Sequence, residues 1–290
     1  MDFSSGDLAG LPVLIVPDLH ARGKFLFDIL DSCLPGKNIT VLEMLELGQL
    51  IICCVGDIFH AEGRARDRWL LAYDDYEAYE NGDFKFESSE PMKAEMIENL
   101  TLLEMLLLLK TSFPPFFHVL KGNHENILNN GEFGNRPFRK FADEGNMVYT
   151  FLECAYGQII PYLIDIYEKN LPICAVFSNC VVSHAEPLRA YSREEIINYR
   201  MKPDVIYGLT WTANDTAQDD SCEKTMKNLL GRKFAKSGIW FGGHRPILGT
   251  YALRQKGKYI QIHNPNEENI AFVMPNKIFN ADEDILNVES

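Results

Sequence analysis

The sequence predicts an α/β fold built around buried β-strands. Five short apolar runs, rich in Val, Ile, Phe and Cys, stop abruptly at polar residues; they lie at 11–16, 50–55, 116–120, 180–182 and 239–241. Runs of this length bounded by Gly or Pro are typical of buried strands. Apolar residues recur at helical spacing over 24–34 and 94–110, between the first three runs. Alternating strands and helices indicate βαβ units around a sheet.

The C-terminal part continues the strand pattern. Short, partly alternating apolar runs at 250–253, 258–262 and 270–274 are separated by Gly, Lys and Asn. They predict a meander of strands in a second sheet. The acidic segment at about 280–290 is expected to be a loosely held tail. We therefore expect a single domain over residues 1–290.

The segment at about 61–93 differs from its neighbours because charged residues and tyrosines crowd it. We interpret it as an insertion on the sheet scaffold, either a cap or lid element or a solvated surface excursion, since most long insertions lie on the surface.

Composition limits the class of protein. With 46% hydrophobic and 24% charged residues, the chain has an ordinary globular balance. Its net charge of −13 disfavours nonspecific nucleic-acid binding. Seven cysteines without a CxxC pair indicate reduced thiols in a cytoplasmic protein. The N-terminus has no secretory signal pattern, and no apolar run is long enough for a bilayer, so we expect no membrane association.

All five N-terminal and central runs end in residues that can bind a metal ion. These residues are Asp18, His20, Asp57, Asn123, His184 and His244. In open α/β sheets, ligands gather beyond the carboxyl ends of the strands. Six candidates exceed the four ligands of a single zinc site. Carboxylates can bridge two cations, and two ions about 3.5–4 Å apart can activate a water and hold a phosphoryl group.

The ordered motifs resemble the calcineurin-like metallophosphoesterase superfamily. They are Asp18-Leu19-His20, Gly56-Asp57, Gly122-Asn123-His124-Glu125, His184 and Gly243-His244. The resemblance covers residue 12 to about 265. It is greatest for the phosphoprotein-phosphatase-like (serine/threonine phosphatase) branch, because residues 209–212 resemble that branch's Leu-Trp-Ser-Asp region. Gly243-His244-Arg245-Pro246 is similar to the Gly-His-Thr-Pro of bacterial and phage members.

The resemblance implies a four-layer α/β/β/α sandwich with two mixed sheets and a dimetal site at the strand ends. One metal would take Asp18, His20 and Asp57. The other would take Asn123, His184 and His244, with Asp57 bridging. A metal-activated hydroxide would attack phosphorus, and His124 would protonate the leaving alkoxide. The ligand mixture favours two divalent ions, either Mn²⁺ or Fe/Zn.

Several positions depart from the family pattern. His60 stands where an aspartate usually orients the catalytic histidine, and Ala61 where an arginine usually binds phosphate. Glu62 is a possible substitute for the aspartate. There is no second histidine two places after His244, where phosphodiesterase branches usually have one. Glu125 is expected to orient a ligand or its loop.

A phosphate dianion needs cationic donors besides the metals. The candidates near the motifs are Arg22, Arg64, Arg66 and Arg245. We expect His118 to be a core histidine and His263 to lie on the surface. Trp211 is expected in the core or in the wall of the site.

The sequence therefore predicts a metal-dependent phosphatase that hydrolyses phosphate monoesters, with a phosphoprotein as the substrate that the resemblance favours. A nucleotide or dinucleoside polyphosphate hydrolase is the alternative enzyme. A metal-binding but catalytically weak scaffold is the alternative of another class, motivated by the replaced aspartate and arginine. The sequence leaves the oligomeric state open.

Overall fold

Two five-stranded sheets form the centre of the protein in a computed structural model, which describes residues 1–288. The first sheet contains, in spatial order, β10 (Ile285–Asn287), β9 (Asn269–Val273), β1 (Val13–Val16), β2 (Ile51–Cys54) and β3 (Phe117–Val119). The second contains β4 (Cys174–Val176), β5 (Cys180–Ser183), β6 (Ile239–Gly242), β8 (Tyr259–Gln261) and β7 (Ala252–Arg254). Both sheets are mixed. Strands β1, β2 and β3 run parallel, as do β5, β6 and β8, and the remaining pairings are antiparallel.

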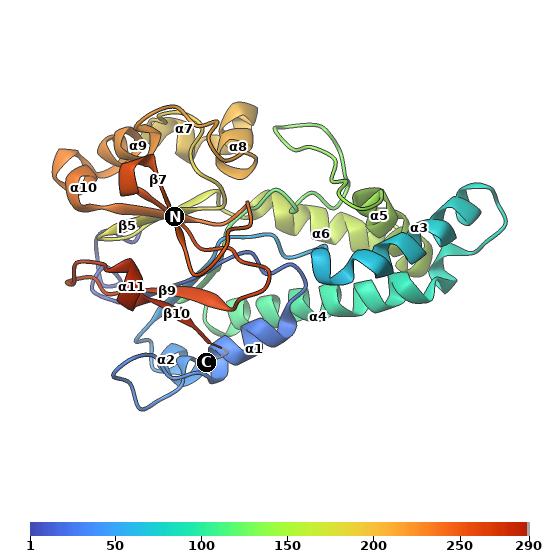
Figure 1. Ribbon diagram of the computed structural model, residues 1–290, viewed down its shortest axis with the longest axis horizontal. Helices are drawn as coiled ribbons and strands as arrows, with labels where there is room; N and C mark the ends of the chain where they lie inside the picture. Colours follow the sequence, from blue (N-terminus) through green and yellow to red (C-terminus); the bar gives the residue numbers. More distant parts are fainter. Residues whose placement is uncertain (289–290) are drawn as a thin grey trace.

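Helices cover the outer face of each sheet (Figure 1). On the first sheet lie α1 (Gly23–Asp31), α2 (Val41–Glu46) and α4 (Glu90–Ser112). On the second lie α7 (Arg193–Ile197), α8 (Pro203–Thr210), α9 (Ser221–Leu230) and α10 (Arg232–Ser237). The remaining helices are α3 (Arg66–Glu80), α5 (Glu144–Tyr156), α6 (Ile159–Asn170) and α11 (Ala281–Asp284). The expected four-layer α/β/β/α arrangement is confirmed.

The strand alternation explains these layers. In β1, Val13 and Ile15 join the apolar cluster between the two sheets, whereas Leu14 and Val16 join the cluster under the helices. Because successive side chains of a strand point to opposite faces, a strand that is apolar throughout must be covered on both sides. The continuous apolar runs of the sequence are therefore central strands of a layered sandwich.

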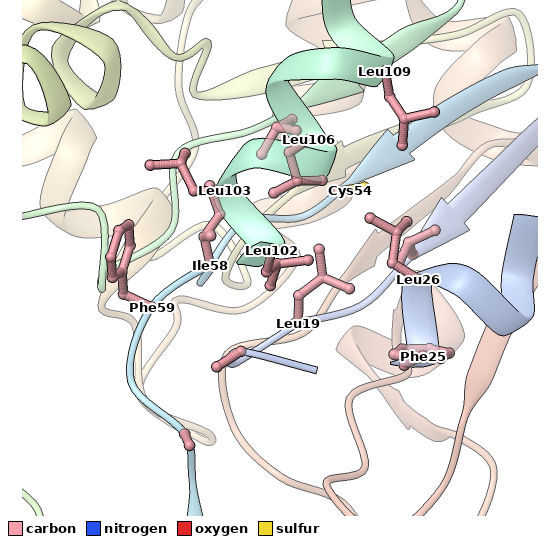
Figure 2. Packing of buried hydrophobic residues seen from close by; sticks show 14 of the residues in the cluster. Leu19, Phe25, Leu26, Cys54, Ile58, Phe59, Leu102, Leu103, Leu106 and Leu109 are labelled. Atoms are coloured by element: carbon pink, nitrogen blue, oxygen red, sulfur yellow. The ribbon is translucent and has the colours of Figure 1, made fainter. Parts of the chain in front are cut away.

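Helix α4 connects the first sheet to a helical arm that extends from the sandwich (Figure 1). At 23 residues it is the longest helix within residues 1–288. Leu102 and Leu106 of α4 pack in the same cluster as Leu19, Ile58 and Cys54 (Figure 2). Leu19 lies between the candidate ligands Asp18 and His20, and Ile58 follows Asp57. Helix α4 therefore packs against both loops that carry these ligands.

The C-terminal part departs from the predictions at two points, although β7 and β8 do form an antiparallel pair in the second sheet as the predicted meander requires. Strand β9 pairs with β1 in the first sheet, and so does not belong to a meander in the second. Its Ile270 faces the helices and its Ala271 the second sheet, so both faces are buried, which a central position allows. The acidic tail is ordered up to residue 288: Ile285 is buried, β10 pairs with β9, and Lys277 pairs with Asp284. The last residues of the predicted tail, 289–290, lie outside the described part.

The charged segment at 61–93 forms α3 and the start of α4, which pack against each other and against α5 in the arm. All seven cysteines are free thiols. Among residues 1–288, no helix combines the length and the apolar character that crossing a bilayer requires.

Candidate metal centre

The candidate ligands follow the carboxyl ends of strands at one edge of the sandwich. Asp18 and His20 follow β1, Asp57 follows β2, and Asn123 follows β3. His184 follows β5 of the other sheet, and His244 follows its neighbour β6. The backbone turns sharply there, because His20, Asp57 and His244 have φ of 43°, 54° and 65°. Left-handed backbone at residues other than glycine costs about 1–3 kcal/mol each and clusters at functional sites.

Asp57 lies at the centre of the cluster. Its Oδ2 atom is 3.6 Å from His20 Nε2, 3.7 Å from His124 Nε2 and 3.4 Å from His184 Nε2. These separations are too long for hydrogen bonds but suit ligand atoms arranged around a common cation. The Asp57 side chain is 1% exposed. A buried carboxylate with imidazoles of both sheets around it is the geometry of a bridging ligand.

A second group of donors lies on the other side of Asp57. Asn123 Oδ1 is 2.8 Å from His184 Nε2 and 2.7 Å from His244 Nδ1. The two histidine atoms are 3.3 Å apart. Asp57, His184 and His244 thus offer ligand atoms that all lie within 4.8 Å of one another.

The tautomers show that these donors fit divalent metal ions. His20 Nδ1 lies 3.0 Å from the carbonyl oxygen of His60, and His184 Nδ1 lies 3.2 Å from that of Val55. A nitrogen facing a carbonyl oxygen must carry the proton. In the neutral ring of His20, Nε2 then presents a lone pair toward Asp57. A nitrogen lone pair that faces a carboxylate is repelled by it unless a cation lies between the two groups. Backbone carbonyl oxygens commonly orient metal-binding histidines in this way.

Asp18 joins the cluster through several contacts. Its carboxylate accepts the backbone N–H of His244 at 3.0 Å, and its Oδ1 lies 3.1 Å from His184 Nδ1. A Cβ atom at Gly243 would stand 2.0 Å from Asp18 Oδ2, so only glycine allows this approach. Asp18 therefore links the two sheets, and it remains a candidate ligand by prediction.

Glu125 holds the loop that carries Asp57. Its carboxylate accepts the backbone N–H groups of Asp57, Ile58 and Gly122 at 2.9, 2.8 and 2.5 Å. A Cβ atom at Gly122 would stand 2.2 Å from Asp57 Oδ1. The predicted orienting role of Glu125 fits these contacts.

His60 lies beside His124, at the position where the resemblance leads us to expect an aspartate. The two Nδ1 atoms are 2.9 Å apart. The loop of His60 is itself held by α4: Asn99 accepts the His60 N–H at 2.7 Å, and Glu95 accepts the Ala61 N–H at 2.8 Å. The arm thus positions His60 and, through it, His124.

The architecture is similar to that of a Saccharomyces cerevisiae protein serine/threonine phosphatase that is described as similar to human phosphatase PP5. The TM-score is 0.57, with 14% sequence identity over 99% of this chain and 82% of that chain. The chain has the calcineurin-like metallophosphoesterase fold. The expected resemblance is therefore confirmed at the level of the fold.

Two further solved structures have lower similarity scores. A cold-active protein-tyrosine phosphatase of a psychrophilic Shewanella species has a TM-score of 0.49, with 13% identity over 99% of this chain and 82% of that chain. A putative diadenosine tetraphosphatase has a TM-score of 0.42, with 14% identity over 99% of this chain and 96% of that chain. No family model and no curated protein matches the sequence.

A cleft of about 310 Å³ opens from the candidate metal centre. His20, His60, Asn123, His124 and His244 reach it from the strand ends. Its other wall is formed by residues 137–141, Trp211 and Arg245. The loop at 137–141 is held in place because the buried Glu144 accepts the backbone N–H of Lys140 at 2.8 Å and that of Phe141 at 2.5 Å. Of the segment at 61–93, which we interpreted as a cap or lid element or a surface excursion, Ala61 and Glu62 line this cleft, and the loop at 137–141 forms part of its wall.

The four candidate arginines differ in position. Arg245 lines the cleft, is exposed, and has no carboxylate partner among residues 1–288. Arg22 donates to backbone carbonyls, among them that of Asp18 at 2.7 Å, and Arg64 pairs with Glu98 at 2.6 Å. Arg66 lies against Asp67 at 3.6 Å and is 60% exposed. Of these four arginines, Arg245 thus lines the cleft, whereas Arg22 is held by backbone carbonyls. Arg139 and Lys140, which the sequence reasoning did not select, also line the cleft.

The prediction for His263 is wrong. The residue is fully buried, with Nδ1 3.2 Å from Asp18 Oδ2 and Nε2 3.0 Å from Glu62 Oε2. Because β8 runs parallel to β6, the residue after β8 emerges at the same edge as His244. His118, by contrast, is the expected core histidine, with Nε2 3.0 Å from the Pro115 carbonyl oxygen.

Burial keeps most of the imidazoles in the centre neutral. Desolvation lowers the pKa of His20 to about 4 and that of His60 to about 3. The pKa of His124 is lowered by desolvation and by the neighbouring His20 and His60. For His184, burial acts in the same direction, but the charges of Asp57 and Asp18 raise its pKa to about 9. A positive charge is therefore stabilised at His184, between the two carboxylates, where a proton or a metal ion can supply it.

Proposed function

We propose that this protein is a dimetal phosphoesterase that hydrolyses phosphate monoesters, with a phosphorylated protein side chain as its substrate. The observation that supports this most strongly is the position of Asp57, whose Oδ2 atom lies 3.4–3.7 Å from three buried imidazole nitrogens of two sheets. The fold shared with a serine/threonine phosphatase supports the reaction class.

The proposed metal ions are two divalent cations, Mn²⁺ or Fe/Zn, which suit mixed imidazole and carboxylate ligands. Asp18, His20 and Asp57 would hold one, and Asp57, Asn123, His184 and His244 the other. When bound, such ions activate water as a nucleophile and neutralise charge on phosphoryl oxygens.

The protein's own side chains do the rest. His124 lies beside Asp57 and lines the cleft, so it is placed to donate a proton from Nε2 to the leaving oxygen. His60 holds the His124 ring through Nδ1, and Phe138 packs on that ring with centroids 3.9 Å apart, which excludes water from it. Arg245 and Lys140 are placed to bind the phosphate oxygens.

The low pKa of His124 has a consequence for catalysis. Burial and neighbouring imidazoles disfavour its charged form in the free protein. The negative charge of a bound phosphate monoester favours that form. A bound phosphate monoester would therefore act against the lowering of the His124 pKa that burial causes.

A nucleotide or dinucleoside polyphosphate hydrolase is the second candidate. Phe138 and Trp211 provide aromatic side chains in the cleft, with Arg139, Lys140 and Arg245 close to them. A base stacked between aromatic rings and a polyphosphate bound by these cations would use the same cleft.

Phosphate release from p-nitrophenyl phosphate by metal-stripped protein, titrated with Mn²⁺, tests the reaction. We expect saturable, metal-dependent release. His184→Ala should lose both activity and metal, whereas His124→Asn should lose turnover and keep the metal. His118→Asn, which changes a buried histidine outside the centre, is the matched control.

Release by the wild type is then compared between a phosphoserine peptide and ATP or a dinucleoside tetraphosphate. A preference for the peptide supports the protein phosphatase, and a preference for the nucleotides supports the second candidate. Two bound metal ions without release from any of these substrates would instead support the catalytically weak scaffold. The cytoplasmic location is part of the proposal, and the seven free thiols support it.

A further inference from the structure

A second group of buried ligand-type side chains adjoins His20 on the side away from His184. Glu62 and His263 form it together with His20, and their ligand atoms lie within 4.8 Å of one another. His20 Nε2 is 3.8 Å from Glu62 Oε1, and His263 Nε2 is 3.0 Å from Glu62 Oε2. All three side chains are buried. This group extends the candidate metal centre beyond the ligands that the family motifs supply.

The fold brings these two residues to the centre from different directions. His263 follows β8, the parallel neighbour of β6, and enters from the second sheet. Glu62 comes two residues after His60, on the loop that α4 holds through Glu95 and Asn99. Both positions are fixed by the scaffold, which is what a metal ligand requires.

The contacts of His263 are difficult to satisfy without a cation. Nδ1 faces Asp18 Oδ2 at 3.2 Å and Nε2 faces Glu62 Oε2 at 3.0 Å, yet neither nitrogen has a hydrogen bond of acceptable geometry. A neutral imidazole carries one proton, so one of its nitrogens presents a lone pair to a carboxylate, and either a second proton or a metal ion must relieve that contact. His20 Nε2 presents another lone pair to Glu62 and Asp57, since its Nδ1 carries the proton.

We propose that Glu62 and His263 are additional ligands of the first metal ion, beside His20 and Asp57; this rests on the proposed dimetal function. With Asp18, which was already assigned to this ion, two imidazoles and three carboxylates would then surround it. Such a set favours transition metals over Mg²⁺, because imidazole suits the former and Mg²⁺ prefers oxygen ligands with several waters. The first metal ion would therefore have more protein ligands than the second.

Co²⁺ titration of the metal-stripped full chain tests this. The number of ions retained is counted by elemental analysis, and the visible absorption spectrum reports their coordination. The variants are Glu62→Gln and His263→Asn, with His118→Asn as the matched control for loss of a buried imidazole. Circular dichroism shows that each variant is folded, and Glu62→Gln remains informative if His263→Asn does not fold.

We expect two Co²⁺ ions in the wild type and in the control. Each test variant should keep one ion at wild-type affinity and bind the other more than about 100-fold more weakly, with a changed spectrum, because loss of a partner that only orients a ligand typically costs about 10–100-fold. If both variants bind two ions at wild-type affinity with an unchanged spectrum, Glu62 and His263 are not metal ligands. That result would leave the proposed dimetal function intact. Fewer than two ions in the wild type would instead contradict the proposed dimetal function.

Discussion

The Nδ1 atoms of His60 and His124 are 2.9 Å apart, so the ring proposed to protonate the leaving group is held by a second imidazole. His60 also stacks on Phe138, with ring centroids 4.9 Å apart and planes inclined by 28°. Its Nε2 has no partner among residues 1–288, so its contact with His124 is the main polar contact of the His60 ring.

His60→Ala should therefore lower kcat about 10-fold or more, part of the roughly 10²–10⁴-fold that a positioned acid contributes. KM and metal content should stay near the wild-type values, because His60 contacts neither Asp57 nor the basic side chains that line the cleft. His60→Asp should restore most of kcat, since a carboxylate can accept the His124 Nδ1–H. The measurements are steady-state kinetics and elemental analysis. Equal losses in the Ala and Asp variants would show that His60 does not act by holding His124.

The arm should control the site through Glu95. This carboxylate is fully buried, pairs with Arg68, and accepts N–H groups from Ala61 and Asn99. Glu95→Ala should destabilise the protein by about 3 kcal/mol, the order of cost for breaking a buried ion pair on one side. It should also lower kcat, because the His60 loop loses its anchor.

Glu98→Ala is the matched control for the loss of a carboxylate from the same helix. Glu98 also pairs with Arg68, but its side chain is 33% exposed, so we expect a cost below about 1 kcal/mol. Urea unfolding of the metal-stripped proteins measures both changes. Similar losses of stability in the two variants would contradict the anchoring role of Glu95.

Much of the site could be predicted from the sequence because each ligand directly follows an apolar run. Asp18, Asp57 and His184 stand at strand ends, and parallel strands bring their carboxyl ends to one edge. His263 could not be placed without knowing that β8 runs parallel to β6. The direction of a strand depends on long-range pairing, which local patterns do not specify.

The helical arm shows the other limit of the sequence. The segment at 61–93 has charged residues at nearly every turn, which is typical of a surface helix. Its buried contacts depend on a few side chains, such as Trp69, which donates to the Ala61 carbonyl at 2.8 Å. The loop that lines the cleft, 137–141, carries no strand or helix pattern and depends on Glu144 of α5 for its shape.

Arg245 and Arg22 should respond differently to substitution. Arg245 lines the cleft without a carboxylate partner in the described chain, so Arg245→Gln should raise KM for a phosphate monoester about 10-fold, the order of one charge-assisted hydrogen bond. Stability and metal content should not change. Arg22→Gln should leave KM nearly unchanged and reduce stability, because the Arg22 guanidinium bonds the carbonyls of Asp18, Asn264 and Glu267. Steady-state kinetics and thermal unfolding measure the contrast. A KM effect at Arg22 and none at Arg245 would reverse the assignment.

His118 should make stability depend on pH independently of the metal centre. Its Nε2 donates to the Pro115 carbonyl at 3.0 Å and its Nδ1 lies 3.2 Å from Lys110 Nζ, so the neutral ring fits between an acceptor and a donor. Burial, together with the Lys110 charge, lowers its pKa from 6.5 to about 4. Between these values the unfolded chain binds a proton that the folded chain does not, so stability falls as the pH decreases.

The full effect of this one group is up to about 3 kcal/mol, since one pKa unit corresponds to about 1.4 kcal/mol. His118→Gln removes the titrating ring, so the gap in unfolding free energy between wild type and variant should change by that order between pH 7 and pH 4. Other buried histidines titrate in both proteins and cancel in the difference. Urea unfolding of metal-stripped protein at a series of pH values gives this difference directly. A gap that stays constant over the series would mean that His118 takes up its proton over the same pH range in the folded and the unfolded chain.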